Sequence, residues 1–170
     1  DPLVDALTSA TGVELPAALT RLEYERTIGL LAVLDRPSAV PEPGGVQLDP
    51  HDATAPFAFV ADNQRKGVSV VPALTCHATV PFSHDRWDDP TDVLERELLD
   101  RARPWVGDAE VVASQVKKWR FATPTEPWPD PCCPLPGGIV LAGDAFAGPK
   151  VEGAFVSGRA AALAARAFGV

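Results

Sequence analysis

The stretch GIVLAGD, residues 138–144, decides how the second half of this chain is interpreted. It is a short apolar run that ends in Gly143-Asp144, and such runs are typical of fully buried strands in parallel sheets. A carboxylate and a backbone without Cβ would then lie at the carboxyl end of a strand, where α/β sheets bind their ligands. An acid directly after a buried strand therefore favours a functional role for Asp144.

A helix is predicted after this strand, from Gly153 to about Phe168. Its start, residues 151–154, would present free backbone N–H groups and the positive end of the helix dipole. A lone strand and helix are only half of a βαβ unit, so we expect the partner strands to come from residues outside this sequence. Small residues that would allow close approach of a neighbouring backbone form a stripe on the helix: Ala154, Ser157, Gly158, Ala161 and Ala165.

Residues 1–122 show mostly strand patterns. The segment 24–35 alternates with apolar residues on both faces, which predicts a strand covered on both sides. Residues 46–48 are predicted to return beside it as an antiparallel hairpin with a long loop. Further strands are predicted at 57–60, at 68–80 with a bulge or edge at Pro72, and at 110–122.

One helix is clearly indicated between Asp89 and Pro104. Asp89 can cap it, Pro90 suits its first position, and Asp92 favours the positive end of the dipole. Apolar residues repeat every four positions at Leu94, Leu98 and Ala102. The predicted fold is α+β: an antiparallel sheet with a covering helix in residues 1–133, and a separate C-terminal strand and helix in residues 134–170.

Composition excludes several classes of protein. The 170 residues carry 15 basic and 23 acidic side chains, a net charge of −8, which disfavours binding to nucleic acid. No run approaches the roughly 18 apolar residues of a membrane-spanning helix. Three cysteines without a Cys-x-x-Cys pair predict free thiols, no metal site and a cytoplasmic setting.

Two further stretches have to be considered together with the Gly-Asp motif: KWRFA at 118–122 and KVEGAFVSGRAA at 150–161. Together they resemble the C-terminal part of the flavin-containing amine-oxidase superfamily, and within it the renalase-like branch of NAD(P)- and FAD-dependent oxidoreductases. Residues 24–26 and 61–67 also look renalase-like. The combination of Gly-Asp with Val-Glu-Gly-Ala-x-x-Ser-Gly is specific, whereas either half alone is weak.

The resemblance implies a fragment of an enzyme that oxidises a small amine or dihydronicotinamide-type substrate by hydride transfer to FAD, with dioxygen as electron acceptor. Residues 1–133 would be its substrate-binding domain, with Trp119 and Phe121 in the pocket, and residues 134–170 the last strand and helix of a Rossmann-like FAD domain. No catalytic side chain is predicted. The residues implied to contact FAD are Gly143, Asp144, Phe146, Val151, Glu152, Gly153 and Ala154.

The Gly-x-Gly-x-x-Gly fingerprint that holds the pyrophosphate in such enzymes does not occur among the 13 glycines. We therefore expect a missing N-terminal segment of the same protein to complete the cofactor site. The isolated chain is expected to be inactive.

Plainer interpretations stand beside these predictions. Trp119 and Phe121 would be core aromatics in the default interpretation of an alternating strand, and His77 an ordinary sheet histidine. The residues Ser83-His84-Asp85 are too close in sequence to form a catalytic triad and predict a turn. The whole chain would alternatively be a stand-alone, non-catalytic ligand-binding or interaction module.

Overall fold

The computed structural model describes residues 2–168, with side chains from residue 6 onward. The chain divides into two compact units, residues 26–122 and residues 1–25 with 123–170, and each is described by itself. The predicted domain boundary after residue 133 differs from the division observed after residue 122. The predicted boundary would cut through the strand β6 (Cys133–Leu135). Residues 1–25 also group with the C-terminal residues.

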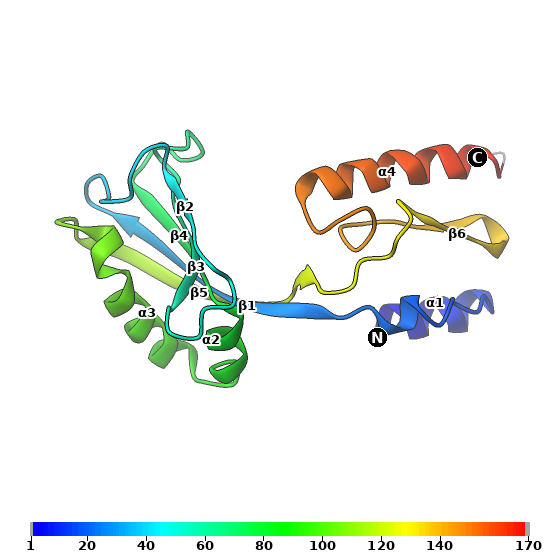
Figure 1. Ribbon diagram of the computed structural model, residues 1–170, viewed down its shortest axis with the longest axis horizontal. Helices are drawn as coiled ribbons and strands as arrows, with labels where there is room; N and C mark the ends of the chain where they lie inside the picture. The colour runs from blue at the N-terminus through cyan, green and yellow to red at the C-terminus, as the bar shows by residue number, and fades with distance from the viewer. Residues whose placement is uncertain (1, 169–170) are drawn as a thin grey trace. The chain divides into compact units, whose positions relative to one another are not determined.

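The unit of residues 26–122 is built on a five-stranded sheet in the order β2-β3-β4-β1-β5, with α3 along one face (Figure 1). The pairs β1–β4, β2–β3 and β3–β4 are antiparallel, as expected for an α+β fold. The elements are β1 (Tyr24–Leu34), β2 (Gly45–Gln47), β3 (Phe57–Asp62), β4 (Ala73–Ala78), α2 (Val80–Asp85), α3 (Thr91–Val106) and β5 (Val111–Pro124).

The core of this unit lies between the sheet and α3. The predicted helix stripe is confirmed, since Leu94, Leu98 and Ala102 are all fully buried. They belong to one cluster with the even-numbered residues of β1, which include Ile28 and Leu30. Burying each large side chain of this kind contributes about 1.5–3 kcal/mol. This packing fixes one face of the sheet against α3.

The opposite face of the sheet is open. Val33 is 38% exposed and Leu31 is half-buried, so the prediction that β1 is covered on both sides is wrong. The apolar residues on this face of β1 do not mark a second layer of the described chain. They lie on a surface that the other residues of this unit leave partly exposed.

Three local predictions are also corrected. β2 pairs with β3 and not with β1, because β4 and β5 occupy both edges of β1. β4 begins only after Pro72, and residues 68–72 belong to the preceding turn. Residues 83–85 are helical and not a turn, since the Thr79 side chain accepts a hydrogen bond from the Phe82 N–H and caps α2.

The ends of α3 also differ from the prediction. Its N-cap is Pro90, with no side-chain cap, so Asp89 does not take that role. The helix continues through Pro104 to Val106. A proline in the last turn removes a single backbone hydrogen bond, and the buried Val106 holds that turn against the sheet.

The second unit contains a two-stranded sheet and two α-helices. The antiparallel pair β6–β7 joins Cys133 to Leu141 and Leu135 to Ile139. Within the described residues β7 is half-buried and pairs antiparallel with β6. Its burial in a parallel sheet completed by residues outside this sequence stays a prediction. A Rossmann-like arrangement stays a prediction. The elements are α1 (Pro2–Thr11), a 3₁₀ turn (Leu19–Arg21), β6, a second 3₁₀ turn (Pro136–Gly138), β7 (Ile139–Leu141) and α4 (Val151–Arg166).

No helix in the described residues combines the length and apolarity needed to cross a membrane.

Candidate functional site

The loop after β7 is held in place from α4. The hydroxyl of Ser157, which is fully buried, accepts a hydrogen bond from the Gly143 N–H at 2.9 Å. A second bond, from the Phe146 N–H to the Gly143 carbonyl at 3.1 Å, closes a tight turn around Asp144. The Gly-Asp motif and the Val-Glu-Gly-Ala-x-x-Ser-Gly motif therefore meet, as their combination in sequence suggests, and Ser157 is the residue that joins them.

Asp144 has a partner that sequence reasoning missed. The Tyr24 hydroxyl donates a hydrogen bond to the Asp144 carboxylate at 3.4 Å, although the two residues are 120 positions apart. Burial, and then the negative charge of Asp144 and this bond, raise the pKa of Tyr24. The phenol thus stays protonated at neutral pH and orients one carboxylate oxygen. No local signal in the sequence indicates a pair at this separation.

Phe146 lies in the core of this unit. It is 5% exposed and packs against Trp128, with ring centroids 6.5 Å apart. The backbone N–H of Trp128 donates to the Ala145 carbonyl at 2.7 Å, which ties the proline-rich stretch to the loop. Phe146 thereby supports the turn at Asp144, and its contact with a cofactor stays a prediction.

The start of α4 and the preceding loop surround a hollow of about 330 Å³. The helix begins at Val151, two residues before the predicted start, and no side chain caps it. Val151 and Glu152 are exposed, whereas Gly153 is buried against the loop. A Cβ on Gly153 would lie 2.1 Å from the Gly148 carbonyl oxygen, so only glycine fits there. The hollow is lined by Ala147, Gly148, Pro149, Lys150, Glu152, Gly153 and Val156.

The backbone of this loop and the start of α4 offer polar groups to a ligand. Gly143 and Gly148 have φ values of +150° and +114°, and a Cβ at either would meet no atom within 4 Å, so the backbone is open to a ligand. The uncapped first turn of a 16-residue helix offers N–H donors to negative charge. The Asp144 carboxylate can accept a hydrogen bond from a hydroxyl of a sugar-like chain.

Trp119 lies on the open face of the sheet in the other unit. Its ring covers Gly29, where a Cβ would lie 2.2 Å from the indole. It also meets His77 edge-on at 5.5 Å, and His77 is 5.6 Å from Phe59. Trp119 is 38% and Phe121 65% exposed, so the alternative that both are core aromatics is wrong. Sequence reasoning could not group Phe59, His77 and Trp119, because only the strand register brings them into one row.

His77 is a sheet histidine whose ionisation is suppressed. Burial, and to a smaller extent the positive charge of Lys66, lower the pKa of His77. The Lys66 ammonium itself lies 5.4 Å from the centre of the Phe59 ring. At neutral pH the row is therefore uncharged, with one cation at its edge.

Replacing His77 with glutamine is expected to reduce the acid sensitivity of the protein. The folded state resists protonation of His77, so the unfolded state binds more protons as the pH falls below the ordinary value of 6.5. Stability from neutral His77 is thus present above that value and lost as the pH falls toward the lower folded pKa. Unfolding midpoints in urea between pH 8 and pH 5 test this, and an identical pH slope in wild type and variant would contradict it.

Other reactive groups have structural explanations. Ser83 is buried and accepts a hydrogen bond from the Ile28 N–H at 3.1 Å, while His84 and Asp85 are exposed, so these three form no triad. Burial raises the pKa of Cys76 to about 12, which makes it unreactive. Among the side chains of residues 6–168, no group of three or more that could ligate a metal is assembled.

Comparison with known proteins supports the fold. No family model and no curated protein sequence matches the chain. Among solved structures, the chain is similar to the "Putative protoporphyrinogen oxidase" from Exiguobacterium sp. 255-15, with a TM-score of 0.61 and 13% sequence identity over 95% of this chain. At this identity the likeness shows the α+β fold alone. The chain spans 39% of the length of that protein.

Proposed function

We propose that this chain is part of an FAD-dependent oxidoreductase of the flavin-containing amine-oxidase superfamily, in its renalase-like branch. The proposed substrate is a small amine or a dihydronicotinamide-type compound, with dioxygen as electron acceptor. One observation carries the proposal: the loop Gly143–Phe146 is fixed by Ser157, close in sequence to the uncapped start of α4. The similarity in fold to the Exiguobacterium protein supports it.

Bound FAD would supply the hydride acceptor, and the residues of this chain would bind and orient it. In this proposal Asp144 accepts a hydrogen bond from the ribityl chain, and the N–H groups of residues 151–153 stabilise negative charge. Trp119 and Phe121 contribute to the substrate surface. No general base is required for hydride transfer, and none is proposed.

An N-terminal segment with the missing Gly-x-Gly-x-x-Gly fingerprint would complete the cofactor site. The exposed face of α4 favours this over the stand-alone module. Val151, Phe155 and Leu163 are 90%, 65% and 64% exposed and recur at helical spacing. Large apolar side chains grouped on one helix face usually mark an interface. We propose that the FAD-binding segment covers them.

Full-length protein that contains this chain is expected to bind FAD and to show flavin absorbance. Asp144→Ala is expected to weaken FAD binding by about ten- to a hundredfold, because a hydrogen bond to a charged group contributes about 1.5–3 kcal/mol. Asp130→Ala is the matched control, since it removes an exposed carboxylate from the same unit. Fluorescence titration of the flavin measures both affinities.

A folded, colourless full-length protein that takes up no added FAD would refute the proposal. If Asp144→Ala and Asp130→Ala lost the same amount of FAD affinity, Asp144 would not be a residue of the FAD site. The stand-alone module predicts instead that the 170-residue chain unfolds cooperatively in the absence of flavin and of any further segment.

A further inference from the structure

We propose that the open face of the sheet binds a flat organic anion, an aromatic or heteroaromatic compound with a carboxylate or phosphate group, and discriminates against amines. The open face is defined here by Phe59, His77, Trp119, Lys66 and Lys117 and by the hollow beside them. As a statement about the enzyme's substrate class, the inference rests on the proposed function, and of its two proposed substrates it favours the dihydronicotinamide-type compound over the small amine.

The strand register builds a row of aromatic side chains on this face, here called the platform, in which the His77 ring is tilted by 51° to Phe59 and by 67° to Trp119. Gly29 and Phe59 are both direct partners of His77, so the three residues lie in one row across β1, β4 and β3. Trp119 of β5 lies over Gly29 and extends the row. The contact of Trp119 with β1 therefore exists only because position 29 has no side chain. Aromatic surface presented in this way suits a planar ligand, which stacks on it by offset or edge contacts.

A hollow of about 320 Å³ lies on the same face, within the usual size range of small-molecule sites. In the register, Leu31 and Thr75 form the row next to Gly29 and His77, and both line the hollow. Its polar groups are uncharged: the Asn63 amide donates to the Thr75 hydroxyl at 2.9 Å, and Gln115 lies opposite on β5. The hollow thus accommodates a flat, largely uncharged body.

The charge on this face has the opposite sign to that of the protein. The net charge of the sequence is −8, yet two lysines flank the platform. Lys66 lies against Phe59, and strand alternation places Lys117 on the side of β5 that carries Gln115 and Trp119. Among the described residues neither lysine forms an ion pair, whereas the neighbouring Arg65 is bound to Glu42 at 2.7 Å.

The carboxylates closest to this face already have interaction partners within the protein. Asp62 points into the protein, where it accepts a hydrogen bond from Ser38. Glu25 precedes this unit in the chain and has a partner of its own. An ammonium group bound at the platform would meet two lysines and would find the Phe59 ring occupied by Lys66. An anion would gain from the same two charges.

The test is a titration of the 170-residue chain without flavin. The probes share one ring system: 2-naphthoate, 2-naphthyl phosphate and 2-naphthylmethylammonium. The Trp119 indole signal, assigned with Trp119→Phe, reports binding at the platform by NMR. We expect both anions to shift this signal and the ammonium probe to bind at least tenfold more weakly.

Variants separate a specific site from general charge. Lys66→Met is expected to weaken anion binding about three- to tenfold, as for loss of a charge-assisted contact that is partly exposed. Arg120→Met removes the same charge from the opposite face of β5 and is expected to leave the affinity within twofold. Thermal melting of both variants checks that the fold is retained.

Tighter binding of naphthoate identifies the anionic group as a carboxylate, tighter binding of the phosphate identifies a phosphate, and either supports the inference. Equal or tighter binding of the ammonium probe, equal losses in both variants, or no shift of Trp119 with any probe overturns it. The titration contains no flavin. If the chain binds the anions but the full-length protein does not bind FAD, the proposed function is refuted and the anion site is not.

Discussion

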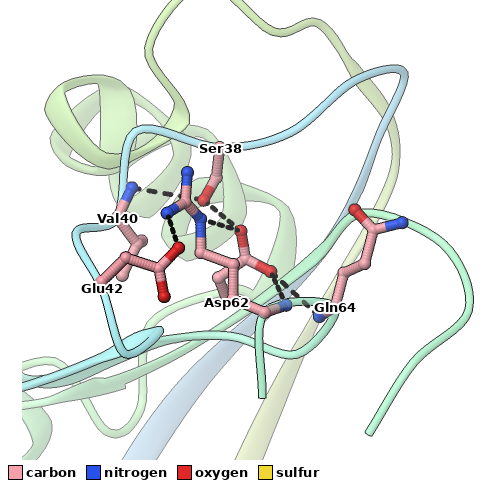
Figure 2. A network of polar contacts seen from close by, with 6 residues as sticks. Ser38, Val40, Glu42, Asp62 and Gln64 are labelled. Atoms are coloured by element: carbon pink, nitrogen blue, oxygen red, sulfur yellow. Dashed lines mark hydrogen bonds and ion pairs between the residues drawn. The ribbon is translucent and has the colours of Figure 1, made fainter. Parts of the chain in front are cut away.

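Replacing Asp62 with alanine is expected to lower the free energy of unfolding of the unit of residues 26–122 by about 3 kcal/mol. Asp62 is 1% exposed and accepts hydrogen bonds from the Ser38 hydroxyl at 2.6 Å and from the Gln64 and Arg65 N–H groups at 2.9 Å each. Figure 2 shows how these groups converge on the carboxylate. Alanine would leave the buried Ser38 hydroxyl and the two N–H groups without their acceptor. Urea unfolding followed by circular dichroism measures the loss.

The loss should depend on pH. Burial alone would raise the pKa of Asp62, but the Ser38 bond, the two backbone bonds and the Arg65 charge outweigh it and lower the pKa. The folded state therefore favours the ionised form, and its contribution is present above the ordinary value of 3.8. That contribution disappears as the pH falls through the lower folded value. The difference between wild type and variant is expected to shrink in the same range.

Glu42→Ala is the control for this prediction. Glu42 contacts Arg65 at 2.7 Å, but its side chain is 80% exposed, so the ion pair is expected to contribute less than about 1 kcal/mol. Similar losses in the two variants would show that the buried carboxylate is not the centre of the network. The network also positions the turn that carries Lys66, so Asp62→Ala is expected to weaken binding of the anionic probes.

Sequence periodicity predicted the elements that depend on local pattern. The helix α3 followed from Leu94, Leu98 and Ala102, and most of β1 and β5 from alternation. Pairing was harder, because the partner of β2 depends on β4 and β5 occupying the edges of β1, which no local signal records. The apolar pattern of β1 was misleading, since an open face that carries Leu31 and Val33 resembles a buried one in sequence.

In the candidate sites, too, features set by local sequence were predictable and features set by long-range contacts were not. The Gly-Asp loop and the helix after it were predictable, because each is a contiguous motif. Trp119 was predicted as a pocket residue, but its contact with His77 was not. The bonds of Ser157 to Gly143 and of Tyr24 to Asp144 were also not predicted, since each joins residues that are not neighbours in the sequence. Such contacts are set by register and packing, which a single sequence does not specify.

Replacing Gly153 with alanine is expected to destabilise the unit of residues 1–25 and 123–170 by about 2–3 kcal/mol. The new Cβ would lie 2.1 Å from the Gly148 carbonyl oxygen and 2.9 Å from its carbon, so the loop backbone has to move. Helix propensity works in the opposite direction, because alanine is favoured over glycine within a helix by about 1 kcal/mol. The sign of the effect therefore reports directly on the contact between α4 and the loop.

Gly158→Ala on the same helix is the matched control, because its Cβ would meet no atom within 4 Å and Gly158 is exposed. This variant is expected to be more stable than wild type by up to about 1 kcal/mol. Amide hydrogen exchange along α4 measures both changes within this unit. If Gly153→Ala were as stable as Gly158→Ala, the loop would not rest on the helix, and the backbone groups of Gly143 and Gly148 would lose the geometry on which the proposed flavin site depends.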